Sequence, residues 1–345
     1  MLASSRLGRL LICVGSLITL MGMTKDFAFA QYSITNLVSN RKGKAKYVDV
    51  DLQDAWGIGY APRGPFWIGD FNSGMSTYYT GAGVRIGGIT VPPGYIGTLG
   101  QPTGVAYNPT NDFQISQGGN SGPAQFVFCT WDGTISGWNP SVNYTSAVIV
   151  VNRSYNYSWF GGLAFGVSNG ANYLYATDNT YSKVRMYDGS FNEQAPFGDA
   201  KLTGFQPYNI ENIKGKLYVT WVNNMGRGAI DIFDTAGNLV KTLTKDKHLE
   251  YPWGMALAPK NFGPVSGDLL VGDFGTGHIN VFDLKTGKWI GYLKDTKNKE
   301  IHIDGLWGIV FGDGGGQNGH SNQLFFAAGP DDEADGLFGV IEYKK

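Results

Sequence analysis

The sequence predicts an all-β protein folded as a six-bladed β-propeller, and three observations carry this prediction. Glycine accounts for 51 of the 345 residues, aromatic residues for 14% and charged residues for 16%, which is typical of many short strands joined by tight turns. A unit of several strands recurs along the chain. The last unit ends before its fourth strand, and a strand-like segment near the N-terminus can complete it.

The repeated unit begins with a strand resembling "WGI", continues with a strand rich in Leu, Val, Phe and Tyr, turns, and adds a third strand. In the first unit these are "DAWGIGYAP" from Asp54, "FWIGD" and "STYYT". A fourth strand follows in the clearest units, as in "NLVKTLT" after Asp234 and "KWIGYLKD" after Gly287. Equivalent positions lie 45 to 58 residues apart, which is the length of a propeller blade. These positions are Gly57, Gly104, Gly162, Asn209, Gly254 and Gly308.

Closure of the ring is predicted from the two ends of the repeat. The segment "YSITNLVSN", Tyr32 to Asn40, reads as a strand but belongs to no unit of its own. It can supply the outer strand that the sixth unit lacks, which would remove the open sheet edges that invite aggregation. The alternative is a β-sandwich of generic glycine-rich and aromatic hairpins, but six ordered units favour the propeller.

The N-terminus has the three parts of a secretory signal peptide. Arg6 and Arg9 precede an apolar run from Leu10 to Met23, and small residues end the segment at Ala30. The run is shorter than the roughly 20 residues that span a bilayer, so an uncleaved anchor is the less favoured alternative. We therefore expect a signal peptide at 1–30 and a propeller at 31–345. The mature protein is expected to be secreted, extracellular, periplasmic or bound to the cell envelope, without membrane insertion.

The charge and cysteine content narrow the partners and the sources of stability. The chain carries 27 basic and 28 acidic residues, a balance that gives no reason to expect nucleic acid as a partner. Only Cys129 remains after signal cleavage, so no internal disulfide can form and the core must stabilise the fold. We expect Cys129 to be a buried small hydrophobic residue, and the protein to be a monomer.

Single units of the sequence resemble the NHL repeat, as in "YPWGMALAP" followed by "GDLLVGDFGTGHINVFD". At full length, the chain is similar to an uncharacterised family of secreted bacterial proteins with an NHL-like six-bladed propeller, first grouped among proteins with C-terminal sorting tails. The matching segments include "NLVSN", "DAWGI", "GDFNSG", "QPTGVAYN", "LWGIVFG" and "FFAAGPDDEADGLFGVIE". This chain stops at "IEYKK" without such a tail. The resemblance implies the fold and no established activity.

A propeller brings the starts of its innermost strands and the ends of its second strands to one face. We therefore expect an acidic mouth on this face, with Asp70, Asp178 and Asp273 at strand ends. For each of these repeated aspartates, formation of the turn is the competing interpretation, because an Asp side chain can bond nearby backbone N–H groups. The residues predicted to form the binding face are Asp54, Gln101, Asp178, Gln206, Asn209, Tyr251, His302 and Asp304.

The segment "DDEADGLFGVIE" gives a weak signal for a metal site. Asp331, Glu333 and Asp335 have the spacing of a calcium-binding loop, and Ca²⁺ prefers oxygen ligands. Glu342 falls at the twelfth loop position, but a strand at about 3.3 Å per residue would carry it roughly 20 Å from Gly336. The cofactor prediction is therefore none certain, possibly Ca²⁺, and a solvated acidic loop is the alternative.

Three functions are compatible with these observations. The first is an exported binding module for a protein, a glycan or a small molecule, presented on the loop-rich acidic face. The second is a calcium-type metal-dependent hydrolase resembling the six-bladed lactonases, with Asp54, Asp178, Asn209 and Asp304 as candidate residues. The third is a structural cell-envelope protein. We rank binding first, because the fold alone cannot establish an enzyme.

Overall fold

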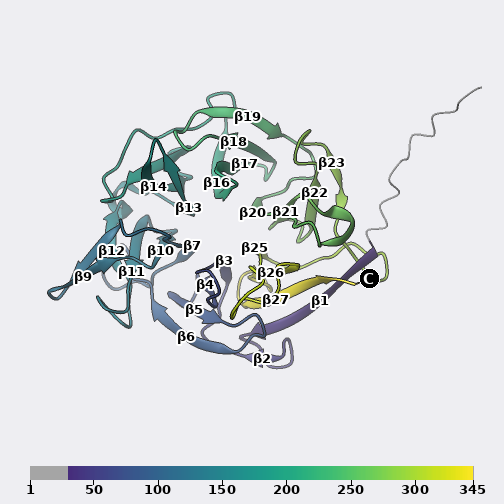
Figure 1. Ribbon diagram of the computed structural model, residues 1–345, viewed down its shortest axis with the longest axis horizontal. Helices are drawn as coiled ribbons and strands as arrows, with labels where there is room; N and C mark the ends of the chain where they lie inside the picture. Colours follow the sequence, from purple (N-terminus) through teal and green to yellow (C-terminus); the bar gives the residue numbers. More distant parts are fainter. Residues whose placement is uncertain (1–29, 345) are drawn as a thin grey trace, which may run out of the picture.

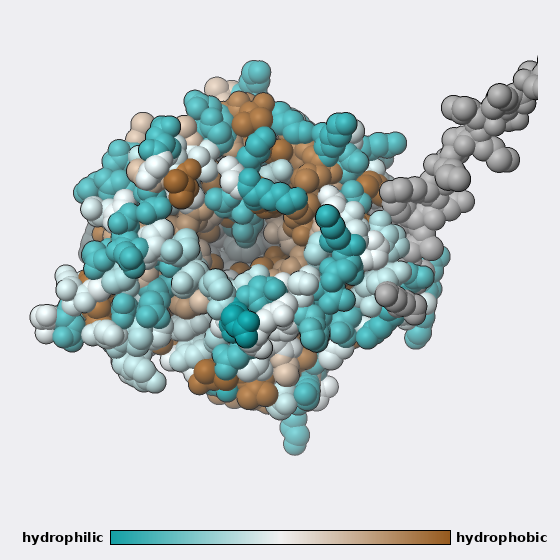
Figure 2. All heavy atoms as spheres, viewed as in Figure 1, coloured by the Kyte–Doolittle hydropathy of each residue, from teal (hydrophilic) through white to brown (hydrophobic). Residues whose placement is uncertain are grey.

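The computed structural model describes residues 30–344, and these form a ring of six sheets around a common centre (Figure 1). This part of the chain contains 27 strands, two short 3₁₀ helices and no α-helix. The helices are η1 (Ser154–Asn156) and η2 (Gly263–Val265). The space-filling view shows a hollow at the centre of the disc, edged in part by hydrophobic residues (Figure 2). The predicted six-bladed β-propeller is confirmed.

The first three blades differ in their outer parts. The first blade consists of β3 (Ala55–Tyr60), β4 (Phe66–Asp70), β5 (Met75–Tyr79) and β6 (Arg85–Thr90). The second consists of β7 (Pro102–Tyr107), β10 (Phe126–Thr130), β11 (Thr134–Trp138) and β12 (Val148–Asn152), with an inserted hairpin of β8 (Gln114–Gln117) and β9 (Asn120–Pro123). The third has only β13 (Phe160–Ser168), β14 (Ala171–Asp178) and β15 (Lys183–Asp188). The inserted hairpin accounts for the long spacing of the second unit.

The remaining blades follow the predicted strand order. The fourth blade consists of β16 (Phe205–Ile213), β17 (Lys216–Asn223), β18 (Gly228–Phe233) and β19 (Leu239–Thr244). The fifth consists of β20 (Pro252–Leu257), β21 (Leu269–Asp273), β22 (Ile279–Phe282) and β23 (Trp289–Tyr292). The sixth consists of β25 (Leu306–Phe311), β26 (Gln323–Ala328), β27 (Leu337–Tyr343) and β1 (Ala30–Ser39). Two short strands, β2 (Tyr47–Val48) and β24 (Lys294–Asp295), pair with β1.

The N-terminal strand closes the ring as predicted. β1 pairs antiparallel with β27, from Tyr32 opposite Tyr343 to Ser39 opposite Leu337. In Figure 1 the purple β1 lies beside the yellow β27, so the two ends of the chain complete one sheet. A bulge between Asn36 and Val38 interrupts the register. This closure leaves no open edge between the first and last blades.

The core lies between neighbouring blades, because each radial sheet buries both faces. Between the first and sixth blades, for example, Phe66 of β4 packs on Phe325 of β26 and Phe338 of β27. Near the axis the backbones approach closely. A Cβ atom added to Gly57 would lie 2.6 Å from the carbonyl oxygen of Thr103, and one added to Gly308 would lie 2.6 Å from that of Trp56. The repeated glycine of the inner strands is therefore a packing requirement.

The predicted signal peptide at 1–30 lies outside the described residues except for Ala30, the first residue of β1. Within residues 30–344, no helix is long and apolar enough to span a membrane.

Candidate functional site

The starts of the inner strands and the ends of the second strands meet at one face, which we call the start face. In the first blade, the backbone N–H of Phe71 donates to the carbonyl oxygen of Asp54 at 3.0 Å. The same bond joins Trp131 to Gln101 at 2.9 Å, and Phe274 to Tyr251 at 3.1 Å. The repeat thus sets the residue that follows each second strand beside the residue that precedes each inner strand.

The aspartates that end the second strands are buried and hold the turns together. Asp70 and Asp273 are both 0% exposed, and burial raises the pKa of each carboxyl well above its ordinary value. Asp70 Oδ2 accepts the backbone N–H of Thr77 at 2.9 Å. Asp273 Oδ2 accepts from Glu250 N at 3.1 Å and from Asn280 Nδ2 at 2.8 Å. The turn-forming interpretation fits both residues, and their expected position at an acidic mouth is wrong.

Asp178, a predicted binding-face residue, is also enclosed in the fold. Its Oδ2 accepts from Arg185 Nε at 2.5 Å and from Ser158 Oγ at 2.9 Å. The side chains of Asp178 and Arg185 are 0% and 4% exposed. A carboxylate satisfied by a buried guanidinium is not available to a ligand, so Asp178 is a structural residue rather than a binding residue.

Asp54 is the predicted residue with the most unusual environment. It is 1% exposed, it has a positive φ of 49°, and its Oδ1 has no hydrogen-bond partner among the described residues. Burial raises the pKa of Asp54 to about 8, and the neighbouring indole groups of Trp56 and Trp307 offset this only in part. Neither indole N–H reaches a partner at hydrogen-bond geometry. Asp54 is therefore a largely protonated acid at neutral pH.

Replacing Asp54 by Asn is expected to make stability less dependent on pH. The folded protein holds this proton up to about pH 8, whereas the unfolded chain releases it near its ordinary pKa of 3.8. Between these values the unfolded state binds fewer protons, so the contribution of Asp54 to the free energy of unfolding falls as pH rises. Thermal melts at about pH 5 and about pH 8 should show a smaller loss of Tm in Asp54→Asn than in the wild type.

The matched control for this experiment is Asp332→Asn, because Asp332 is an exposed acid on the same face. This variant should lose as much Tm between the two pH values as the wild type. An Asp54→Asn variant with the wild-type pH dependence would contradict a neutral, buried Asp54.

The other predicted binding-face residues are dispersed. Asn209 is buried and donates from Nδ2 to the carbonyl oxygen of Trp253 at 2.9 Å. Asp304 is exposed, and its Oδ2 accepts the backbone N–H of Asp331 at 2.9 Å. His302 is exposed beside His278, with ring centroids 5.6 Å apart. Gln206 is partly buried, and no ligand role is indicated for it.

The predicted calcium loop does not form a metal site. Asp335 Oδ1 instead accepts from Arg41 Nη1 and Asn40 Nδ2, each at 3.3 Å. Asp331 and Glu333 have positive φ values of 62° and 65° in a tight turn. Within residues 30–344, no group of three or more His, Cys, Asp or Glu side chains is arranged to hold a metal ion. The ligand assignment of Asp331, Glu333 and Asp335 is therefore wrong, because local hydrogen bonds direct the loop.

Aromatic side chains, rather than carboxylates, gather at the centre of the start face. The ring centroids of Trp56 and Trp307 are 3.5 Å apart and stacked, and those of Phe274 and Trp307 are 4.1 Å apart. Tyr208 of the fourth blade reaches Trp307 of the sixth, so the cluster covers the propeller axis. We call this the aromatic cluster, and it contains Trp56, Phe71, Trp131, Trp159, Tyr208, Tyr251, Trp253, Phe274 and Trp307.

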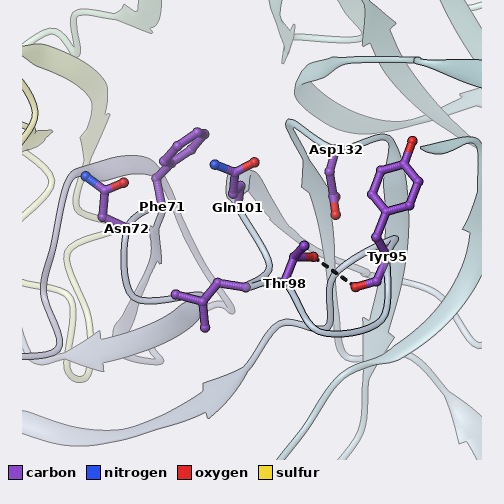
Figure 3. A pocket seen from close by; sticks show the side chains of 7 residues that line it. Phe71, Asn72, Tyr95, Thr98, Gln101 and Asp132 are labelled. Carbon is purple, nitrogen blue, oxygen red and sulfur yellow. Dashed lines mark hydrogen bonds between the residues drawn. The ribbon is translucent and has the colours of Figure 1, made fainter. Parts of the chain in front are cut away.

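Beside the aromatic cluster, two adjoining pockets of 420 and 390 Å³ share Tyr95 and Asp132. We call the pair the start-face groove. One pocket is lined by Phe71, Asn72, Thr98, Leu99 and Gln101 in addition to the shared residues. The other is lined by Trp131, Ser154, Tyr157, Ser158, Trp159 and Thr180. In Figure 3, Gln101 lies between Phe71 and the pair Asp132 and Tyr95.

The polar groups of the start-face groove are held in place. Asp132 Oδ2 accepts from Gly94 N at 2.5 Å, and its Oδ1 accepts from Thr130 Oγ1 at 2.5 Å. The Tyr95 hydroxyl donates to the carbonyl oxygen of Ser154 at 2.5 Å. No Lys, Arg or His lines either pocket. The groove thus offers fixed hydrogen-bonding groups and aromatic surface, without positive charge.

Sequence reasoning identified Gln101 and Tyr251 but missed most of the aromatic residues. The signal was present, because an aromatic residue directly follows the end of the second strand in three blades, at Phe71, Trp131 and Phe274. Attention to the conserved-looking turn acid hid it. Cys129, as predicted, is buried, and burial raises its pKa to about 12.

The fold and the site define a six-bladed β-propeller with an aromatic-lined groove on its start face. Uncharacterized protein R648 of Acanthamoeba polyphaga mimivirus is 30% identical over 334 residues, covering 91% of this chain and 81% of that protein. Uncharacterized protein L690 of the same virus is 30% identical over 334 residues, covering 91% and 86%. This chain belongs to the family of these uncharacterised proteins. They are viral, whereas the sequence resemblance pointed to secreted bacterial proteins.

Solved structures agree on the fold. A streptogramin B lyase superposes with a TM-score of 0.53 at 12% identity, covering 91% of this chain and 98% of that one. Virginiamycin B lyase from Staphylococcus aureus gives a TM-score of 0.53 at 12% identity, covering 90% and 99%. At this identity the likeness concerns the fold alone. No family model matches the chain.

Proposed function

We propose that this protein is a binding module whose start-face groove takes a neutral glycan chain. The observation that carries the proposal is the pairing of exposed aromatic rings with fixed neutral polar groups in two adjoining pockets. Trp131 and Tyr157 are 42% and 79% exposed, although large aromatic side chains usually bury most of their surface. Exposed aromatic rings that border a groove indicate a binding surface.

The chemistry of the groove favours sugars over other ligands of similar size. The apolar C–H faces of a sugar ring can cover Trp131 and Tyr157, while its hydroxyls bond to amide and hydroxyl groups such as those of Gln101 and Ser158. Asp132 is oriented by two hydrogen bonds and retains further acceptor capacity for hydroxyl donors. Phosphate or nucleic acid is disfavoured, because the lining has a carboxylate and no cationic side chain.

The calcium-type hydrolase receives less support than the binding module. Its candidates Asp54, Asp178, Asn209 and Asp304 do not converge, because Asp178 pairs with Arg185 and Asp304 lies exposed on a loop. Virginiamycin B lyase has been solved in a catalytically inactive form with quinupristin, so a propeller of this shape can accommodate a large ligand. This observation suits a binding module equally well.

Export remains part of the proposal. Cleavage near Gln31 would leave all of the pairing between β1 and β27, which begins at Tyr32. A mature chain starting there would keep the strand that closes the ring.

Glycan binding is tested on the full chain with a glycan array, followed by calorimetry with the oligosaccharides that bind. Trp131→Ala should weaken binding about tenfold or more, because a fully used aromatic anchor typically accounts for more than about 1 kcal/mol. The matched control is Tyr144→Ala, since Tyr144 is 73% exposed but does not line the groove. Failure of the wild type to bind any glycan, or equal loss of affinity in both variants, would overturn the proposal.

A further inference from the structure

The face opposite the start face has a second concavity at the axis. Here the inner strands end around a cavity of 560 Å³, which leads into a narrow neck between the blades. We call it the end-face funnel, and its wall includes Ile58, Val105, Leu163, Met255, Ile309 and Glu211. The volume lies in the range of small-molecule sites, which are typically about 300–1,000 Å³. Glu211 and Asn209 also line the neck, so the acid is at the inner end.

Glu211 breaks the repeat at a position where the fold requires no acid. Two residues after the repeated inner-strand glycine, the other blades carry a small or aliphatic residue. These are Gly59, Ala106, Ala164, Ala256 and Val310. Asn209, on the same strand, likewise replaces the glycine itself. The fourth blade therefore places two polar side chains at the axis that the five other blades do without.

The acid has no cationic partner in the funnel. Burial raises the pKa of Glu211 to about 8, and the Asn209 side chain offsets this only in part. No Lys, Arg or His is among the residues that line the funnel. The other lining acid, Asp313, accepts the backbone N–H groups of Arg63 at 2.6 Å and Gly315 at 2.9 Å. The Tyr60 hydroxyl donates to the carbonyl oxygen of Phe311 at 2.9 Å.

We propose that the end-face funnel binds an amphipathic monoamine, with its ammonium group at Glu211 and its apolar body along the aliphatic wall. A carboxylate within an apolar wall is costly unless it is paired, and an ammonium supplies the missing charge together with three donors. The apolar body removes the aliphatic wall from water, which adds a favourable contribution proportional to the area covered. A carboxylate ligand is excluded by repulsion, because both ionisable lining groups other than tyrosine are acids.

This site is independent of the start-face groove and has its own pH signature. An ammonium binds the ionised form of Glu211, so its affinity should rise as pH increases toward about 8. Affinity should then fall once the amine itself loses its proton near about pH 10. A neutral ligand of the same shape should show no such rise.

The experiment is calorimetry on the full chain with n-octylamine, using n-octanol and octanoate as neutral and anionic probes. Octylamine should bind at least about tenfold more tightly than either, and Glu211→Gln should remove this preference while sparing octanol binding. Ala106→Leu narrows the funnel without changing its charge and should weaken both amine and alcohol. Glu300→Gln, an exposed acid outside the funnel, is the charge-matched control and should bind octylamine as the wild type does.

Three outcomes would overturn the proposal. They are octylamine binding that is absent, octylamine binding that is equal in Glu211→Gln, or affinity that does not rise with pH below about 8. Trp131→Ala should leave octylamine binding unchanged, so failure of the glycan proposal and failure of this one are distinguishable.

Discussion

Removal of residues 31–39 is expected to abolish cooperative folding of the propeller. β1 pairs with β27 from Tyr32 to Ser39, so its loss exposes a complete strand edge in the sixth blade. The buried side chains of Tyr32, Leu37 and Val38 are lost as well. Each contributes about 1.5–3 kcal/mol by burial, and the Tyr32 hydroxyl also donates to Phe262 O at 2.7 Å. Together with the ladder, this approaches the whole stability of a typical domain, about 5–15 kcal/mol.

The measurement is near-ultraviolet circular dichroism and a thermal melt of the truncated chain. Ile34→Thr is the control, because Ile34 lies on the same strand but is 38% exposed, and its variant should melt close to the wild type. A peptide spanning residues 30–40, added in trans, should restore part of the signal. A truncated chain that melts cooperatively within a few degrees of the wild type would show that β1 is dispensable.

Replacing Arg185 by Met is expected to destabilise the fold by about 3–5 kcal/mol, because it leaves a buried carboxylate without its partner. Arg185 Nε lies 2.5 Å from Asp178 Oδ2, and its Nη1 bonds to Glu193. Asp178 has no exposure to solvent. Removing the guanidinium should cost far more than the packing of one side chain, since the methionine fills much of the same volume.

Urea denaturation provides the free energies of unfolding. Arg153→Met is the matched control, because Arg153 also pairs with Glu193 but the two side chains are 24% and 32% exposed. A pair this accessible should contribute no more than about 1 kcal/mol. Adding Asp178→Asn to Arg185→Met should recover part of the loss, because the unpaired charge is gone. Equal effects of the two single variants would refute a structural role for the buried pair.

Much of the fold was predictable because repeats are local in sequence. The "WGI" strands, the fourth strands after Asp234 and Gly287, and the closing strand from Tyr32 each follow from short patterns of residues. The inserted hairpin β8–β9 and the three-stranded third blade were not predicted. After β15, the segment 189–204 forms turns and isolated bridges, such as Val184 with Phe197, in place of a fourth strand.

The candidate site was less predictable, because the repeat pattern gives the position of a residue along a strand but not its surroundings. Asp70, Asp178 and Asp273 were placed at the correct end of the disc, yet their carboxyl groups face backbone N–H groups and a guanidinium. Predicting that would have required knowledge of Arg185 and Asn280 as partners. Glu211 was overlooked for the opposite reason, since it interrupts a pattern that the search was following.

The sequence by itself determined the number of blades, their order and the strand that closes the ring, because strand periodicity and turn residues act over short distances. The tertiary structure alone decided which side chains meet at the axis. Trp56 and Trp307 stack although they are far apart in the chain, and Glu211 faces a funnel built by the inner strands of other blades. Such contacts depend on closure of the ring, which sets blades against one another only when the whole core has formed.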